Sequence, residues 1–240
     1  MIFPVIMVAG SSCGFFVAGS SAQSSFEGTV LDQESPDIRL ILLTEQSYTL
    51  NLYYSDEPLS AEGQAGTTVR PQGPIVVGGR GLSQAIPLSG SVLFLWAKDV
   101  GTQSGFRMVA KVTLESENVD QVVLLLPENG KLRGYPIDAS EENFKGGATL
   151  FFNTLDVPIA ARFNDDVSVV YPFKPLIVEA PEYEGKSWYG LRMYEPVEGG
   201  GAKIFCSGRW PFQSHVRVYN FIYRNSTSGR IDYRAINEFR

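Results

Sequence analysis

The first 26 residues of this 240-residue chain lack any charged side chain, and the first basic residue is Arg39. The stretch is apolar, is interrupted by small residues and ends in Ser20-Ser21-Ala22-Gln23. An apolar run before a small-x-small sequence is typical of a cleavable export signal, so residues 1–22 are predicted to be a signal peptide. The absence of a basic residue before the run departs from this pattern. A lipid anchor on Cys13 and a retained membrane anchor therefore stay open as alternatives.

Cysteine is scarce as well. The chain contains Cys13 and Cys206 only, and removal of the signal would leave Cys206 alone. A protein with one cysteine cannot form an internal disulfide, so its stability must come from packing. We expect an exported protein, in the periplasm, in association with the envelope or outside the cell, with no transmembrane span after signal removal.

Residues that carry common catalytic chemistry are few. The only histidine is His215, and the sequence has no His-Glu-x-x-His, Gly-x-Ser-x-Gly or Gly-Lys-Ser/Thr motif. The glycine-rich run 78–81 lacks the strand–helix context of a phosphate-binding loop and is expected to form a turn. Cys206 and His215 are the one thiol–imidazole pair, but a buried strand cysteine is the simpler interpretation. No cofactor or metal site is predicted, and a non-catalytic protein is favoured over an enzyme.

Two carboxylates provide the catalytic alternative. Glu115 and Glu117 would share one face of a β-strand, since side chains two residues apart point to the same side. A carboxylate pair at a suitable separation can hydrolyse a glycosidic bond. The favoured interpretation of residues 115–120 is nevertheless a solvated turn.

Positive charge is in deficit and unevenly distributed. The formal net charge of −6 argues against a general nucleic-acid binder. Residues 186–240 carry nine basic and four acidic side chains, a net of +5, so residues 1–185 carry −11. We expect the two parts to pack together and partly neutralise each other. The alternative is a protein partner, or self-association, through the acidic N-terminal and basic C-terminal parts.

No window of the sequence has the apolar i, i+3, i+4, i+7 spacing of a confident helix, and short apolar runs take its place. The 24 glycines, 14 prolines and 19% of charged residues suit many strands joined by turns. The expected strands are 40–43, 48–54, 92–96, 106–114, 122–126, 149–152, 167–171, 176–178, 188–194, 203–210 and 216–224, the last forming a hairpin with 230–236.

The run 122–126 is apolar on both faces, which a sandwich or an interface between two layers would bury. The predicted fold is therefore all-β: an antiparallel β-sandwich, built as two packed immunoglobulin-like modules or, alternatively, as one large sandwich. The expected organisation is a signal over 1–22, a module over 23–127, a linker over 128–146 and a module over 147–240.

One internal similarity relates residues 90–112 to residues 147–169, with seven identities in 23 positions. A duplicated sandwich half would produce it. So would two unrelated β-hairpins of this composition, and this second interpretation is favoured.

Large aromatic residues are the candidates for ligand contact. Trp188, Tyr189 and Trp210 each lie beside turn-prone neighbours and are the predicted binding residues, although core packing competes with that role. In the strand 216–224, alternation places Arg217 on the same face as Tyr219, and we expect a buried central strand with Arg217 at its edge.

The sequence Gly146-Gly147-Ala148-Thr149-Leu150, the sequence Tyr171-Pro172-Phe173-Lys174-Pro175 and the closing hairpin resemble uncharacterised exported bacterial all-β proteins. The resemblance covers about the last hundred residues and implies a sandwich in an exported protein. The predicted function is an exported, non-catalytic binding or assembly protein. The alternatives are a glycoside hydrolase that uses Glu115 and Glu117, and a structural component of the cell envelope.

Overall fold

The computed structural model describes residues 36–45, 48–59, 69–115, 119–179, 188–197 and 199–240. In these residues the regular structure consists of 16 β-strands, without any helix. The all-β prediction is thus confirmed. Over the same ranges there is no helix of the length and hydrophobicity needed to cross a membrane.

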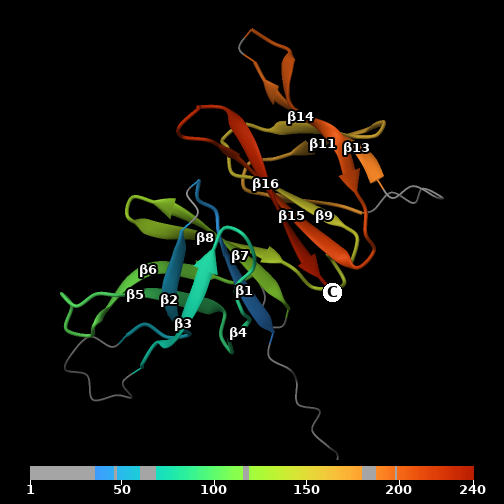
Figure 1. Cartoon of the computed structure of the whole chain (residues 1–240). Coiled ribbons are helices and arrows are strands. Elements are labelled where there is room, and N and C mark those ends of the chain that lie inside the picture. Colours follow the sequence, from blue (N-terminus) through green and yellow to red (C-terminus); the bar gives the residue numbers. More distant parts are fainter. Residues whose placement is uncertain (1–35, 46–47, 60–68, 116–118, 180–187, 198) are drawn as a thin grey trace, which may run out of the picture. The chain divides into compact units, whose positions relative to one another are not determined.

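The strands form four sheets of four strands, and Figure 1 labels all of them except β10 and β12. The first eight strands are β1 (Asp37–Leu42), β2 (Thr49–Ser55), β3 (Gln72–Gly78), β4 (Ile86–Pro87), β5 (Val92–Lys98), β6 (Phe106–Thr113), β7 (Gln121–Glu128) and β8 (Lys131–Asp138). The second eight are β9 (Thr149–Asn153), β10 (Ile159–Phe163), β11 (Asp166–Val170), β12 (Pro175–Val178), β13 (Trp188–Pro196), β14 (Ala202–Pro211), β15 (Val216–Arg224) and β16 (Ile231–Phe239). Sheet A has the order β4-β1-β7-β8, sheet B β3-β2-β5-β6, sheet C β12-β9-β15-β16 and sheet D β11-β10-β13-β14.

The two sets of eight strands have the same topology. Adding eight to each strand number converts the order of sheet A into that of sheet C, and the order of sheet B into that of sheet D. The correspondence includes the parallel pairs, because β1 runs parallel to β7 and β9 runs parallel to β15. The chain therefore contains one sandwich topology twice. The 57-residue sequence similarity does not reflect this repeat, since it aligns β5 with β9, and the counterpart of β5 is β13.

Each sandwich has its own apolar core. Between sheets A and B, inward-facing residues such as Leu42, Leu52 and Leu95 are almost fully buried. Between sheets C and D, Phe151 and Leu191 occupy the corresponding space. The alternation of inward and outward side chains along each strand produces both cores.

A third apolar cluster joins sheet A to sheet C. Val122 and Leu124 of β7 lie in this cluster with Phe221 of β15, whereas Val123 and Leu125 belong to the core between sheets A and B. Sheets A and C therefore bury both faces. This confirms the expected two-sided burial of the run 122–126, and it explains why that run is apolar at every position.

The segment expected as a linker, 128–146, contains β8. This strand pairs with β7 along its whole length, from Gln121 opposite Asp138 to Glu128 opposite Lys131. Asn129 and Gly130 form the turn between them, with positive φ angles of 50° and 75°, as a two-residue hairpin requires. The last strand of the first sandwich thus lies inside that segment, and the connection to β9 begins after Asp138.

Candidate functional site

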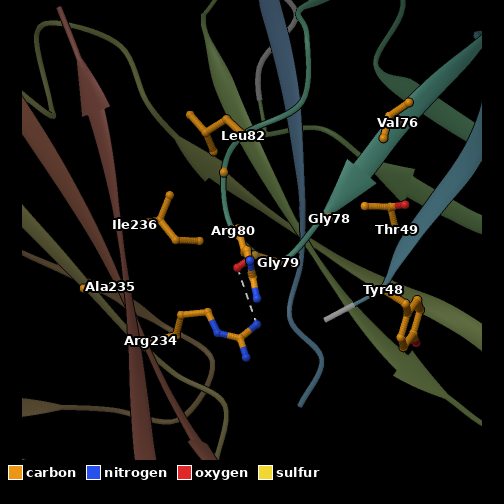
Figure 2. A pocket seen from close by; sticks show the side chains of 11 residues that line it. Tyr48, Thr49, Val76, Gly78, Gly79, Arg80, Leu82, Arg234, Ala235 and Ile236 are labelled. Carbon is orange, nitrogen blue, oxygen red and sulfur yellow. Dashed lines mark hydrogen bonds between the residues drawn. The ribbon is translucent and has the colours of Figure 1, made fainter. Parts of the chain in front are cut away.

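A cavity of about 650 Å³, which we call the cleft, lies between the first sandwich and the last strand of the second. The start of β2, the end of β3 and the 78–82 loop form one side, and β16 forms the other (Figure 2). The residues that line the cleft are Tyr48, Thr49, Val76, Gly78, Gly79, Arg80, Gly81, Leu82, Arg234, Ala235 and Ile236.

The 78–82 loop approaches its neighbours so closely at Gly79 that a side chain does not fit there. A Cβ atom on Gly79 would lie 2.8 Å from the carbonyl oxygen of Leu42 and 2.5 Å from the Nη1 atom of Arg234. Glycine is therefore needed at this position, because the backbone of Leu42 and the guanidinium of Arg234 both lie close to it. The sequence prediction of a turn here is confirmed, since residues 79–81 form bends directly after β3.

Arg234 reaches the same loop from the opposite side. Its Nη1 atom donates a hydrogen bond of 3.4 Å to the carbonyl oxygen of Gly79, drawn as a dashed line in Figure 2. Its guanidinium also lies 5.9 Å from the centre of the Tyr223 ring, within the range of a cation–π interaction. Burial is the main cause of the raised pKa of Tyr223, so the phenol is protonated at neutral pH. The neighbouring ring and the carbonyl thus hold one cation at the wall of the cleft.

The lining of the cleft combines positive charge with apolar surface. Arg80 and Arg234 contribute two guanidinium groups, and none of the lining residues within the described ranges is acidic. Leu82 and Ile236 add apolar side chains, and Tyr48, which is 39% exposed, lines the cleft as well. Guanidinium groups bind carboxylates and phosphates through paired, charge-assisted hydrogen bonds. The described part of the lining also has no histidine or cysteine, so its side chains favour binding of an anion over acid–base or nucleophilic chemistry.

The predicted aromatic binding residues are divided between two faces of sheet D. Tyr189 is 3% exposed and shares a hydrogen bond of 3.1 Å with Thr149, so it belongs to the core. Trp210 lies opposite Tyr189 in the β13–β14 register, and its ring packs 6.0 Å from that of Phe151. Trp188 points to the outer face, where the guanidinium of Arg209 lies 4.4 Å from its ring centre. Of the three, Trp188 is the most exposed, at 37%.

The structure places Glu115 in an exposed bend after β6. Its backbone N–H donates a hydrogen bond of 3.2 Å to the side-chain oxygen of Gln121. Glu117 lies outside the described residues, so the two-carboxylate hydrolase stays a prediction.

Cys206 is buried in the core between sheets C and D. Burial raises the pKa of its thiol, against the opposing effect of a hydrogen bond with Tyr233. His215 is exposed, with its ring 6.5 Å from that of Phe239. The thiol and the imidazole therefore have different neighbours, which favours the interpretation of Cys206 as a core residue. In the part of the chain with described coordinates, no three His, Cys, Asp or Glu side chains gather as a metal site would require.

Sequence reasoning missed the cleft, because its two walls are 155 residues apart at Gly79 and Arg234. The glycine-rich run was the one local signal. Neither the protein-family models nor the curated proteins contain a match to this chain. The fold and the cleft define a class of protein: an all-β protein of two sandwiches with a basic, partly apolar cavity between them.

Proposed function

We propose that this chain is an exported, non-catalytic binding protein that holds an organic anion in the cleft. The observation that carries the proposal is the pair Arg80 and Arg234 in a cavity of about 650 Å³, with no carboxylate among the described residues that line it. This volume is within the range of small-molecule sites, on the order of 300–1,000 Å³. Such sites commonly lie between structural modules, as this one does.

The chemistry of the lining defines the ligand class. A carboxylate or phosphate group would bind the two guanidinium groups, because both are permanently charged and present several donors. The remainder of the ligand would contact Leu82 and Ile236, so a molecule with an apolar portion fits better than a fully hydrated inorganic ion. The hydroxyl group of Tyr48 offers one further polar contact. We therefore expect a small organic acid or phosphate ester.

Binding can be tested with the purified chain by isothermal titration against citrate, benzoate, glucuronate and glucose phosphate, each paired with a neutral analogue. We expect at least one anion to bind, and Arg80→Gln and Arg234→Gln to weaken it about tenfold or more, since a charge-assisted hydrogen bond contributes roughly 1.5–3 kcal/mol. Arg234→Lys keeps the positive charge but removes the paired hydrogen bonds of the guanidinium, so it separates the effects of the two on affinity.

Arg230→Gln is the matched control, because it removes the same charge at an exposed residue that lines neither the cleft nor any other cavity described below. The proposal fails if the neutral analogues bind as well as the anions, if the control weakens binding as much, or if no anion binds.

Export is the second part of the proposal and is supported by the charge-free segment 1–26. N-terminal sequencing of the protein recovered from its producing cell tests it. A mature chain that begins at Gln23 is the expected result, and an intact Met1 would contradict it.

A further inference from the structure

The outer face of sheet D carries a second group of cations. Side chains alternate along β13, so Tyr189 and Leu191 are buried in the core while Trp188, Gly190 and Arg192 face outward. A cavity of about 390 Å³ lies on this face, and no residue lines both it and the cleft. The residues that line it are Arg162, Asn164, Asp165, Trp188, Gly190, Leu191, Arg192, Ser207, Gly208 and Arg209.

Two arginines on this face lie directly opposite each other on neighbouring strands. Arg162 of β10 is the register partner of Arg192 of β13. Like charges in such a cross-strand position are destabilising. Arg162 is partly compensated, because it donates hydrogen bonds of 2.9 Å to the carbonyl oxygen of Asn164 and to Asp165. Arg192 forms no ion pair with any described residue and is exposed.

A third arginine lies one row further along the sheet. Arg209 of β14 is the register partner of Gly190, and its guanidinium lies over the Trp188 ring at 4.4 Å. Outward-facing residues on one strand are about 7 Å apart, so the two rows place exposed cations at successive positions across the sheet. Gly190, between Trp188 and Arg192, has no side chain, and the Asn164 side-chain oxygen that accepts a hydrogen bond of 2.8 Å from its N–H lies 3.5 Å from where a Cβ atom would be. The result is a shallow basic surface with an aromatic ring at one end.

We infer that this face binds an acidic polysaccharide. Its carboxylates would be held by Arg192 and Arg209, and a sugar ring would lie beside Trp188, next to Gly190 and the Asn164 side chain. A bound polyanion would also relieve the repulsion between Arg162 and Arg192. A polymer of uronic acids suits this surface better than a nucleic acid, because the net charge of −6 repels the densest polyanions most strongly. The inference is independent of the proposed ligand of the cleft.

Affinity electrophoresis of the purified chain in gels that contain alginate, a polyuronate, tests this inference. We expect retardation in alginate and none in neutral dextran. The double variant Arg192→Gln/Arg209→Gln should weaken the apparent affinity at least tenfold. Trp188→Ala should weaken it as well without changing the charge, which non-specific attraction to a polyanion would not predict.

Arg224→Gln/Arg230→Gln is the matched control, because it removes two charges from exposed residues outside both cavities and should leave retardation in alginate unchanged. The inference would be overturned if this control lost as much affinity for alginate as the Arg192/Arg209 double variant, if the chain were retarded in dextran, or if it were not retarded in alginate. Tighter binding to single-stranded DNA with the same dependence on Arg192 would assign the face to a nucleic acid instead. The midpoint of thermal unfolding distinguishes a role of Arg192 in binding from a role in stability. Arg192→Gln should not lower this midpoint, and a lowered midpoint together with lost binding would contradict the proposal.

Discussion

The guanidinium of Arg39 in β1 is ion-paired with the carboxylate of Glu238 in β16, 199 residues further along the chain. Glu238 is only 7% exposed, accepts a hydrogen bond of 2.8 Å from the Tyr219 hydroxyl group and lies 3.8 Å from Arg217. Arg39 belongs to sheet A and the other three residues to sheet C. The ion pair therefore connects the two sandwiches beside their shared apolar cluster.

Glu238→Gln is expected to lower the free energy of unfolding by about 3 kcal/mol, because it leaves buried guanidinium charge without its carboxylate. Urea unfolding followed by tryptophan fluorescence measures the change. The matched control is Glu128→Gln, which removes a carboxylate that lies 3.9 Å from Arg133 at the exposed surface and should change stability by about 0.5 kcal/mol or less. Similar losses for both variants would show that the buried position of Glu238 has no special effect.

The close approach at the cleft leads to a second prediction. Gly79→Ala should destabilise the protein by about 1–3 kcal/mol, because the added methyl group meets the backbone of Leu42, which cannot move without disturbing β1. It should also weaken any anion bound in the cleft, since Arg234 would be displaced. Gly81→Ala is the control, because no atom lies within 4 Å of a Cβ atom there. Thermal unfolding and isothermal titration of both variants provide the comparison, and equal behaviour would contradict the prediction.

The opposed arginines of sheet D, Arg162 and Arg192, lead to a third prediction. In low salt and without polysaccharide, Arg192→Gln is expected to stabilise the protein by a few tenths of a kcal/mol, because it removes a like-charge contact with Arg162. The gain should shrink as salt is added, since both side chains are at the surface. Unfolding curves at two ionic strengths measure both effects. A loss of stability in low salt would mean that Arg192 supports the fold.

The burial of Cys206 leads to a fourth prediction. In a Cys13→Ser background, the thiol of Cys206 should react with Ellman's reagent at least about a hundredfold more slowly in the native protein than in urea, because reaction needs an exposed thiolate. Burial also raises the pKa of this thiol, which lowers the thiolate fraction further. Rapid reaction of the native protein at neutral pH would contradict burial and would favour the thiol–imidazole interpretation.

Local patterns in the sequence predicted features that depend on neighbouring residues, such as the strands and the burial of their faces. The apolar run in β7 indicated burial on both faces, and the structure divides its residues between two clusters. The same alternation would have separated Trp188 from Tyr189, because Leu191 and Met193 continue the buried face of β13. Proximity to turn residues was the weaker signal for these aromatics.

Contacts between distant segments account for what the sequence did not reveal. Arg217 was expected at a strand edge, but it is fully buried, because the carbonyl oxygen of Ala139 accepts its hydrogen bond at 2.7 Å and Glu141 forms an ion pair with it. Those partners precede it by 78 and 76 residues. The cleft and the duplicated topology depend in the same way on pairings between segments far apart in the chain, and short-range periodicity carries no information about them.

The last prediction concerns acid stability and Asp138, at the end of β8. Burial raises the pKa of this carboxyl, but hydrogen bonds from Ser140 and Asn143 outweigh burial, and the net pKa lies below its ordinary value. A carboxyl with a lowered pKa in the folded state stabilises the protein at pH values above its ordinary pKa of about 4. That contribution is lost as the pH falls through the lowered value. Asp138→Asn should therefore be less stable than the parent chain at pH 7, and the difference should shrink over the acidic range below about pH 4. Urea unfolding across this range measures it, with Asp156→Asn as a control for loss of an exposed charge, and a difference that grows in acid would contradict the assignment.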